Sequence, residues 1–490
     1  MSDHLGSKGP RSHDLQVDQD TEKPLSAHKE HLFDQDHVAV DYAGAHAKLD
    51  PEEIKLVKRL DMFIMPTLWI MYVFNYLDRN AIALARLDNL EDDLGLDSTQ
   101  YQTCVMVLFA GYLCGQIPSN MLMTKVRPSW YMAGAMAVWA IVSALTAVAH
   151  DFTGLVLARF FLGLVEAPFY PGALYMLSLF YTRKEIATRM SVLYTGALAA
   201  TAVAGLIAIG IFEMSGVGGI TGWRWLFIIQ GALTFVIAVV SGFILPDEPL
   251  KTKWLSEAQR QLAHDRIHAD TVEVRENSSA LRGLWESVKD VRLWVFVLMQ
   301  HMHIAAGAYK NFFPTVIQTL GYGRTATLAL TCPPYFIAGV TSILWALNSG
   351  RMNERTWHIT IAKSVAIIGF VTACSTLNTG ARYFAMCLFS IGVYACHSII
   401  LGWVAVTCAQ TKEKKAVSLA VVNTFATLSQ IWTAYLWPSS DAPRYTMAMS
   451  ASAAVSFGAL ALAWIMKFML ISANKKIKQS NNEATLLYAY

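Results

Sequence analysis

The sequence predicts an all-α integral membrane protein with twelve transmembrane helices, arranged as two halves of six. Three observations lead to this fold class. Only 15% of the 490 residues are charged, against about 25% in soluble proteins. Apolar runs near the roughly 20 residues that a helix needs to cross the hydrocarbon core recur along the chain. One long polar stretch divides these runs into two equal sets, a repeat plan common among secondary transporters.

Twelve apolar runs are the predicted spans. Those of the first half cover residues 62–83, 100–122, 129–149, 153–179, 189–212 and 223–245. Those of the second half cover residues 291–317, 325–347, 358–377, 382–407, 417–437 and 445–471. The fourth span contains Gly163, Pro168, Pro171 and Gly172, which predict close packing and a kink in that helix.

The segments outside the spans complete the predicted domain organisation. Residues 1–58 are polar and rich in His and Asp, so we expect a disordered cytosolic N-terminal tail. This tail lacks the apolar core of a signal peptide, and the first helix itself is expected to direct insertion. Residues 59–246 and 291–472 hold the two six-helix halves. Residues 247–290 form a cytosolic linker with one or two amphipathic helices, and residues 473–490 form a cytosolic C-terminal tail.

Lysine and arginine gather in alternate short loops, and this asymmetry predicts the orientation of the chain. The basic loops contain Lys125, Arg127, Arg183, Lys184, Arg189, Arg351, Arg355, Lys412, Lys414 and Lys415. The loop after the first span is acidic, and the other intervening loops carry single arginines. Because basic loops stay in the cytosol, both termini of this multi-pass chain are predicted to be cytosolic.

Composition and motifs exclude several classes of function. A net charge of +3, without a basic stripe, does not suggest a nucleic-acid partner. The sequence contains no G-x-x-x-x-G-K-[ST], G-x-S-x-G or H-E-x-x-H motif, so we expect neither an ATP-driven pump nor an enzyme. The seven cysteines are dispersed in or beside apolar runs and form no C-x-x-C pair. We therefore predict no disulfide, no metal site and no cofactor.

Few ionisable side chains lie deep in the predicted spans, and these are the candidates for function. A charge at membrane depth costs roughly 2.5–3.5 kcal/mol on insertion scales, so it usually faces a cavity or a partner. The deep side chains are Asp78, Arg79, Arg159, Glu166, His301, His303, Lys310 and His397. The alternative is that opposite charges merely pair and hold helices together. Lys363 is expected to reach the cytosolic face, because long side chains near helix ends extend to the interface.

The spacing of Arg159 and Glu166 places both on one face of the fourth helix, about 11 Å apart along its axis. This separation predicts that the two residues act at two positions along one transport pathway rather than forming a direct ion pair. On the eleventh span, Asn423 either contacts a substrate or hydrogen-bonds a neighbouring helix. His397 on the tenth span is either a pH-responsive cavity residue or a contact between helices.

Several longer segments resemble one family. The helix 4 signature of the major facilitator superfamily, in its anion:cation symporter branch, resembles residues 159–190, RFFLGLVEAPFYPGALYMLSLFYTRKEIATRM. The helix 6 block of its fungal allantoate, nicotinate and vitamin permease group resembles residues 222–249, GWRWLFIIQGALTFVIAVVSGFILPDEP. The same group resembles NFFPTVIQTLGYGRTATLALTCPPY at 311–335 and YLWPSSDAPRY at 435–445. The resemblance covers roughly residues 61–470 and implies the major facilitator fold.

The resemblance also implies roles for the buried charges. In related acid transporters, helices 1, 4, 7 and 10 line a central cavity that opens alternately to each side of the membrane. By position, Asp78 and Glu166 are implied as proton-coupling residues, and Arg79 and Arg159 as substrate-binding residues. Lys310 is either a second cationic contact, for a substrate such as a dicarboxylate, or a structural partner of Glu166.

His397 and Asn423 complete the predicted substrate-binding set, and for each of them a contact between helices remains the alternative. The loop SGRMNER between the eighth and ninth spans has glycine where relatives tend to have aspartate. Gating at the cytosolic face is therefore assigned to Arg351, Glu354 and Arg355.

The leading interpretation is a secondary active transporter that takes up a small organic anion, such as a carboxylate or vitamin acid, together with protons across a fungal plasma membrane. The alternatives are an exporter of an acidic metabolite on the same scaffold and a nutrient sensor that binds without transporting. The expected partners are the organic anion, protons and the lipid bilayer. We expect a monomer.

Overall fold

The structure, a computed structural model, describes residues 50–123, 126–270, 280–408, 412–480 and 488. The regular structure in these residues is entirely helical. Most of the predicted N-terminal tail and part of the C-terminal tail lie outside the described residues. The first described helix, α2, covers Pro51–Ala85, so its first turns, of about 3.6 residues each, fall within the range assigned to the tail.

The helices of the first half follow α2 in close succession. They are η1 (Arg86–Asp88), α3 (Leu90–Leu94), α4 (Ser98–Met123), α5 (Pro128–Leu145), η2 (Thr146–Val148), α6 (Phe152–Glu166), α7 (Phe169–Phe180), α8 (Arg183–Phe212), η3 (Val217–Gly219) and α9 (Gly222–Ile244). The linker contains η4 (Pro249–Lys251), α10 (Glu257–Asp270) and α11 (Ala280–Lys289).

The second half is interrupted more often. Its helices are α12 (Val291–Ala306), η5 (Gly307–Asn311), α13 (Phe313–Gln318), α14 (Arg324–Met352), α15 (Thr356–Ser375), α16 (Thr379–Tyr394), α17 (His397–Thr407), α18 (Lys412–Thr427), α19 (Ser429–Thr433), η6 (Ala434–Leu436), η7 (Ser439–Asp441) and α20 (Thr446–Ser480).

Nine helical stretches of the described residues are long and apolar enough to cross a membrane. The three other predicted spans are occupied by α4, by α12 with η5 and α13, and by α18 with α19 and η6. The all-α membrane fold predicted from the sequence is confirmed, and its count of twelve helices is consistent with the structure.

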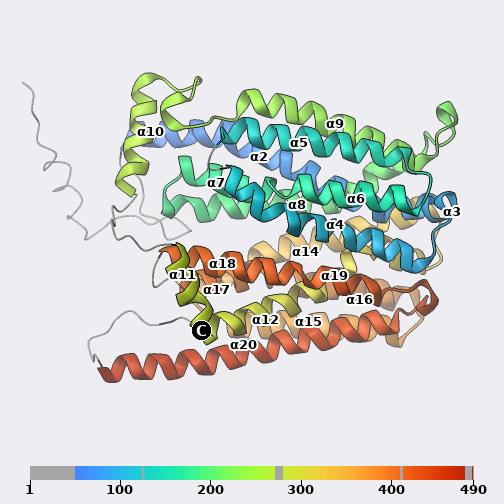
Figure 1. The fold of residues 1–490 in the computed structure, drawn as a ribbon. Helices are drawn as coiled ribbons and strands as arrows, with labels where there is room; N and C mark the ends of the chain where they lie inside the picture. Colours follow the sequence, from blue (N-terminus) through green and yellow to red (C-terminus); the bar gives the residue numbers. More distant parts are fainter. Residues whose placement is uncertain (1–49, 124–125, 271–279, 409–411, 481–487, 489–490) are drawn as a thin grey trace, which may run out of the picture. The chain divides into compact units, whose positions relative to one another are not determined.

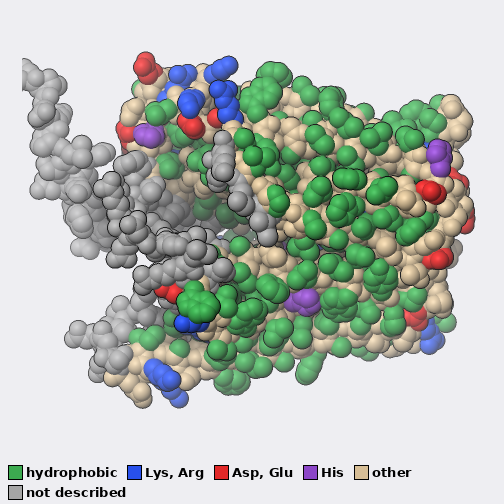
Figure 2. Space-filling model, in the orientation of Figure 1, with side chains coloured by type: hydrophobic (Ala, Val, Ile, Leu, Met, Phe, Trp, Pro, Cys, Tyr) green, Lys and Arg blue, Asp and Glu red, His purple; other side chains and the backbone are tan. Residues whose placement is uncertain are grey.

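The surface between the helix ends is apolar, as a lipid-facing surface must be. Large hydrophobic side chains are exposed along the helices, among them Phe243 at 75%, Phe336 at 64% and Phe384 at 62%. Figure 2 shows hydrophobic side chains over most of the visible face, with Lys, Arg, Asp and Glu gathered toward its two ends. Because soluble monomers rarely expose apolar surface on this scale, the helices are expected to lie in lipid.

The helices pack as two bundles (Figure 1). In the first, α4 packs on α6 and α5 packs on α9; in the second, α15 packs on α16 and α20, and α12 packs on α18 and α20. The two bundles meet chiefly where α8 packs on α14, with further contacts of α4 to α19 and η6. Two cavities lie in the space between the bundles, and residues of both halves line each of them.

Gly163 lets α6 approach α4 closely. A Cβ atom at this position would overlap the backbone of Leu108 on α4. Small residues permit such approaches in membrane helices, where van der Waals packing drives association. At the predicted kink of the fourth span, Ala167 and Pro168 separate α6 from α7, and both residues keep right-handed helical backbone angles.

Each linker helix packs on one half of the chain. Arg266 of α10 contacts Glu185 at 3.1 Å and Glu53 at 3.2 Å, both in the first half. α11 packs on α18 of the second half, and Asp290, which follows α11, pairs with Lys414 of α18 at 2.7 Å. Both linker helices lie at the same end of the helices (Figure 1), the end that the basic loops predict to be cytosolic.

Candidate functional site

A cavity of about 150 Å³ lies between the two halves. It is lined from the first half by α2, α4, α6, α7 and α8, and from the second half by α12, η5, α16, α17, α18 and α19. Five of the predicted site residues line it: Arg79, Glu166, Lys310, His397 and Asn423. The remaining lining is strongly aromatic.

Glu166 is the centre of the polar network in this cavity. Its Oε1 atom accepts hydrogen bonds from Asn75 Nδ2 and from Nε of Arg79, with which it forms an ion pair. The Glu166 side chain is 3% exposed and the Arg79 side chain 22%. Because the other carboxylate oxygen has no hydrogen-bond partner among the described residues, this carboxylate depends on Arg79 and Asn75 for stabilisation.

Arg79 is also held between two tyrosine rings. Its guanidinium carbon lies 5.5 Å from the centroid of Tyr76 and 5.0 Å from that of Tyr112. A guanidinium over an aromatic face is attracted by the negative charge of the ring's π system. The rings and the carboxylate together fix the direction of the Arg79 side chain before any ligand arrives.

Arg159 is buried, with 2% exposure, and does not line the large cavity. It lines a second cavity of about 30 Å³, farther along α2 toward η1, together with Arg79 and Lys310. Its Nε and Nη1 atoms have no hydrogen-bond partner among the described residues. The structure therefore places Arg159 and Glu166 at two different cavities on one side of α6–α7.

Asp78 lies on a different face of α2 from Arg79 and lines neither cavity. It accepts hydrogen bonds from Trp139 Nε1 at 3.0 Å, Thr234 Oγ1 at 3.1 Å and Ser143 Oγ at 3.3 Å. These donors come from α5 and α9. Asp78 thus joins three helices of the first half, and the structure does not bring it to the large cavity as the sequence led us to expect.

In the second half, three predicted residues line the large cavity, each from a different helix. Lys310 lies in η5 and lines both cavities. His397 is the first residue of α17, where its ring stacks on Tyr194 of the first half with centroids 5.3 Å apart, and its Nδ1 lies 3.3 Å from Gln300 Nε2. Asn423 lines the cavity from α18.

Two basic residues of the predicted spans line neither cavity. Lys363 does not reach the cytosolic face: it is 0% exposed, and its Nζ has no hydrogen-bond partner among the described residues. Its side chain is therefore enclosed by the protein interior. His301 points away from the cavity, with Nδ1 2.8 Å from Phe425 O and Nε2 accepting from Trp432.

Sequence reasoning missed the aromatic lining. Tyr72, Tyr76, Tyr112, Tyr170, Tyr194, Tyr309 and Tyr394 all line the large cavity. One signal was available in the first helix, where Tyr72, Asn75, Tyr76 and Arg79 recur at spacings of three and four and so share a face. The other tyrosines come from different helices, and only tertiary packing brings them together.

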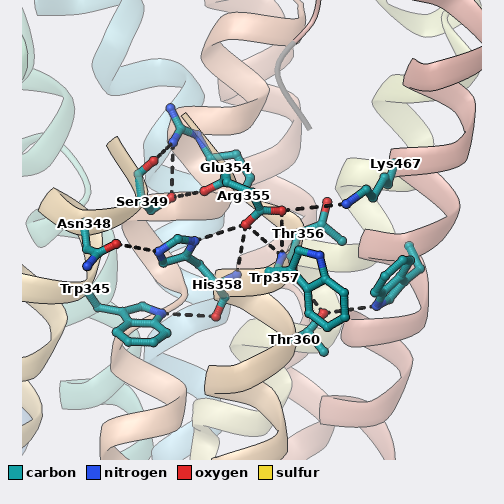
Figure 3. Close-up of polar contacts among 11 residues, drawn as sticks. Trp345, Asn348, Ser349, Glu354, Arg355, Thr356, Trp357, His358, Thr360 and Lys467 are labelled. Atoms are coloured by element: carbon teal, nitrogen blue, oxygen red, sulfur yellow. Dashed lines mark hydrogen bonds and ion pairs between the residues drawn. The ribbon is translucent and has the colours of Figure 1, made fainter. Parts of the chain in front are cut away.

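Two of the predicted gating residues, Glu354 and Arg355, belong to a polar cluster at the linker end of the second half (Figure 3). Glu354 accepts hydrogen bonds from the first-turn amides of α15 and lies 3.1 Å from His358 and 3.9 Å from Lys467 of α20. Arg355 donates to Ser349 Oγ at 3.1 Å. Arg351 is exposed. The contacts of Glu354, Arg355 and His358 join α14, α15 and α20.

The polar contacts between the halves lie at the opposite end. Asp88 forms an ion pair with Arg324, Thr103 Oγ1 lies 3.1 Å from Tyr435 Oη, and the Ser439 amide donates to Ser98 Oγ at 3.0 Å. Aromatic contacts add to this closure, including the edge contact of Tyr101 and Phe312. The sequence signal for the ion pair was an acidic loop and a single arginine on the side predicted to be non-cytosolic.

The structure has two helical bundles with a lipid-facing apolar surface. The bundles are closed at one end, and the cavity between them contains paired charges. This arrangement is that of a membrane transport protein. Comparison with known proteins gives the family. The model of the Major Facilitator Superfamily matches residues 68–434. The chain belongs to the Major Facilitator Superfamily, and as a member it is a transporter rather than an enzyme.

Relatives and solved structures agree with this assignment. The chain is 29% identical over 360 residues to the "Major facilitator-type transporter hxnP" of Emericella nidulans, covering 72% of each chain. It is also 29% identical over 379 residues to a "Putative tartrate transporter" of Agrobacterium vitis, covering 77% of this chain and 86% of the other.

Among solved structures, a bacterial homologue of the human lysosomal transporter Spinster matches with a TM-score of 0.66 at 14% identity, covering 84% of this chain and 97% of the other. The xylose transporter XylE of E. coli matches with a TM-score of 0.63 at 12% identity, covering 82% and 97%. At these identities the likeness shows the fold alone.

Proposed function

We propose that the protein is a proton-coupled symporter that takes up a small organic anion, such as a carboxylate or a vitamin acid. We further propose that it belongs to the anion:cation symporter branch, with the fungal allantoate, nicotinate and vitamin permeases. One observation carries the proposal: the Arg79–Glu166 ion pair stands on the wall of the central cavity. In this ion pair, the Arg79 guanidinium can bind an anionic substrate, and the Glu166 carboxylate can bind a proton.

Coupling follows from competition for Arg79. A substrate carboxylate that binds the guanidinium displaces Glu166, whose side chain is then a buried charge without its counter-ion. An uncompensated charge in such a site is strongly unfavourable, and protonation of Glu166 removes it. In the other direction, a protonated Glu166 releases Arg79 for the substrate. Proton and anion therefore promote each other's binding.

Arginine suits this role better than lysine because its planar fork binds both oxygens of a carboxylate. The Tyr76 and Tyr112 rings already orient that fork, which lowers the entropy lost on binding. Across the cavity, Lys310, His397 and Asn423 supply contacts from the second half. A substrate held between the two sets of residues draws both halves of the protein into one binding event.

For Asp78 we propose an indirect role in proton coupling. Its three hydrogen bonds hold α2 against α5 and α9, and this anchoring sets the position of the adjacent Arg79. For Arg351, Glu354 and Arg355 we propose a gating role within the second half. The Glu354 cluster makes α14, α15 and α20 move as one body when the halves change their relative position.

Other findings support the class of substrate and the orientation. The name of the Agrobacterium vitis relative refers to tartrate, an organic acid. The loop charges favour cytosolic termini, and an uptake symporter of this kind would operate in the plasma membrane. The large cavity, at about 150 Å³, suits a small acid better than a peptide or lipid.

The proposal is tested with the full chain in proteoliposomes. Labelled acids are offered with and without an inward proton gradient, and accumulation above equilibrium is measured. Glu166→Gln is expected to abolish accumulation while exchange of substrate across the membrane continues. Arg79→Lys is expected to weaken apparent affinity for the acid roughly tenfold, the equivalent of about 1.4 kcal/mol. The matched control is Arg444→Gln, which removes an exposed cation that lines neither cavity.

A Glu166→Gln protein that still concentrates acid against its gradient contradicts the proton-coupling role. If the same inward proton gradient drives the acid only outward, the result contradicts uptake and indicates an exporter. Binding without any flux indicates a sensor.

A further inference from the structure

The seventh and eleventh predicted spans are both interrupted beside the large cavity. In the seventh span, α12 is followed by the 3₁₀ helix η5 (Gly307–Asn311). In the eleventh span, Leu428 separates α18 from α19, and the Ile431 amide donates to Leu428 O, only three residues back, at 3.2 Å. Because 3₁₀ bonding within a longer helix often marks a hinge, both interruptions are places where the chain can change shape.

Gln430 of α19 holds both ends of η5. It is buried, with 2% exposure, on the wall of the large cavity. Its Nε2 donates to the backbone O of Ile304, three residues before η5 begins, at 3.2 Å. Its Oε1 accepts from Nδ2 of Asn311, the last residue of η5, at 3.1 Å. Because a backbone carbonyl can only accept, these two contacts fix the orientation of the Gln430 amide.

His301 makes the opposite connection, from α12 to the interruption of the eleventh span. Its Nδ1 lies 2.8 Å from the O of Phe425, in the last turn of α18, and Trp432 Nε1 of α19 donates to its Nε2 at 3.2 Å. Since a carbonyl accepts and an indole N–H donates, His301 carries its proton on Nδ1. Polar groups at each interruption are thus satisfied by a side chain from the other span.

The segment that Gln430 holds carries a residue of the cavity wall. Lys310 lies in η5, directly before Asn311, and lines both cavities. Because 3₁₀ hydrogen bonds have poorer geometry than α-helical ones, a short segment of this kind depends on side-chain contacts for its position. Movement of η5 would displace Lys310 along the wall.

We propose that Gln430 is a positioning residue, which sets the place of Lys310 on the cavity wall by fixing both ends of η5, and that His301 joins the two interruptions into one hinge. No contact between Gln430 and the substrate is needed. Glutamine and histidine commonly join membrane helices through hydrogen bonds; here they join the two interruptions, so the seventh and eleventh spans change shape together. The effect on substrate rests on the proposed function, whereas the hinge does not.

The hold on η5 is tested by hydrogen exchange of the purified full chain without ligand, read in peptides that cover η5. Gln430→Met removes both amide contacts, and exchange in η5 is expected to become about 3- to 10-fold faster. Asn311→Leu removes one contact, so its effect is expected to be smaller and to add nothing to that of Gln430→Met. The matched control is Gln318→Met, which changes an exposed glutamine that lines neither cavity.

The single hinge is tested at His301. His301→Phe removes both of its polar contacts and is expected to speed exchange in η5 as well as in residues 425–432. His301→Asn keeps a donor at the place of Nδ1 and is expected to return exchange in both segments toward the wild-type rate. Unchanged exchange in η5 of the His301→Phe protein contradicts a hinge shared by the two spans.

The positioning role is tested by transport in proteoliposomes, with labelled succinate or nicotinate as the probe, whichever the protein accumulates. Gln430→Met is expected to raise KM at least about threefold in the wild-type background. In a Lys310→Met background it is expected to leave KM unchanged, because its effect passes through Lys310 and the two changes are then not additive. A purely structural Gln430 lowers the maximal rate by the same factor in both backgrounds and leaves KM unchanged in both.

Wild-type exchange in η5 of a folded Gln430→Met protein overturns the proposal, and so does a KM effect of equal size with and without Lys310. Either result leaves the proposed function standing if the acid is still accumulated. If Gln430→Met does not fold, Asn311→Leu decides by the same measurements. If no organic acid is transported, the proposed function fails, and hydrogen exchange alone decides whether Gln430 holds η5.

Discussion

The Asp88–Arg324 ion pair is predicted to set how often the protein opens at the end opposite the linker. It joins η1 of the first half to the start of α14 in the second, and the Asp88 side chain is 3% exposed while that of Arg324 is 39% exposed. A hydrogen bond to a charged group contributes about 1.5–3 kcal/mol, and the exposure of Arg324 places this pair at about 1–2 kcal/mol. Its loss is expected to shift the ratio of closed to open states by about 5- to 30-fold.

The two partners are not equivalent. Asp88→Asn leaves the half-exposed Arg324 in contact with water, so its effect is expected to be the smaller. Arg324→Gln leaves a buried carboxylate without its cation, and a buried charge that loses its partner is more costly than a pair that is removed altogether. Asp88→Asn is therefore expected to fall near the 5-fold end of the range and Arg324→Gln near or above the 30-fold end.

The assay is a distance measurement between spin labels at Val217→Cys and Tyr322→Cys, made after replacement of the native cysteines. These positions are exposed, at 54% and 47%, and lie one in each half at this end. Both substitutions of the pair are expected to add a longer distance to the distribution. Glu248→Gln is the control, because it breaks an exposed ion pair with Lys251 inside the linker segment. Identical distributions in all variants would refute the reasoning.

Two further predictions concern buried carboxylates. Burial raises the pKa of Asp290, but hydrogen bonds from Arg292 and Lys414 outweigh this effect and bring the pKa down to about 2. The pKa in the folded protein therefore lies below the unfolded value of about 3.9. The stability that Asp290 contributes is present above about pH 4 and is lost as the pH falls toward 2. The unfolding-temperature gap between wild type and Asp290→Asn should therefore stay constant from about pH 5 to 8 and narrow below about pH 4; a gap that widens on acidification contradicts the assignment. Asp78→Asn should destabilise the protein by about 1–3 kcal/mol, measured by thermal unfolding, whereas Glu166→Gln should alter accumulation more than unfolding; the reverse pattern would make Asp78 the proton carrier.

The sequence was sufficient for the fold because length, apolar runs and loop charges are properties of segments. It was less informative about which way a side chain faces. Asp78 and Arg79 are adjacent, so they point about 100° apart on the helix, and only Arg79 lines the large cavity. Which of the two lines it depends on how α2 is rotated against α5 and α9. That rotation is fixed by Trp139, Ser143 and Thr234, none of which is near Asp78 in the sequence.

Lys363 shows a different limit. Its distance from the end of the ninth span suggested that its long side chain reaches water, and many lysines in such positions do. In the structure this side chain is 0% exposed, so neighbouring helices cover the face it occupies. The position along a helix is readable from sequence, but the neighbour that covers a given face is not.

The interruptions of the helices connect these limits to the site. α12 gives way to η5 at Gly307, three residues before Lys310; α16 ends at Tyr394, three residues before His397; and α18 ends at Thr427, three residues before Gln430. Backbone groups released by such breaks need polar surroundings, which a membrane protein offers only beside a cavity or within its packed interior. Two of the three predicted spans that are not among the nine membrane-crossing stretches of the described residues contain these breaks. Residues beside both breaks, Gly307 and Lys310 in one span and Thr427 and Gln430 in the other, line the large cavity.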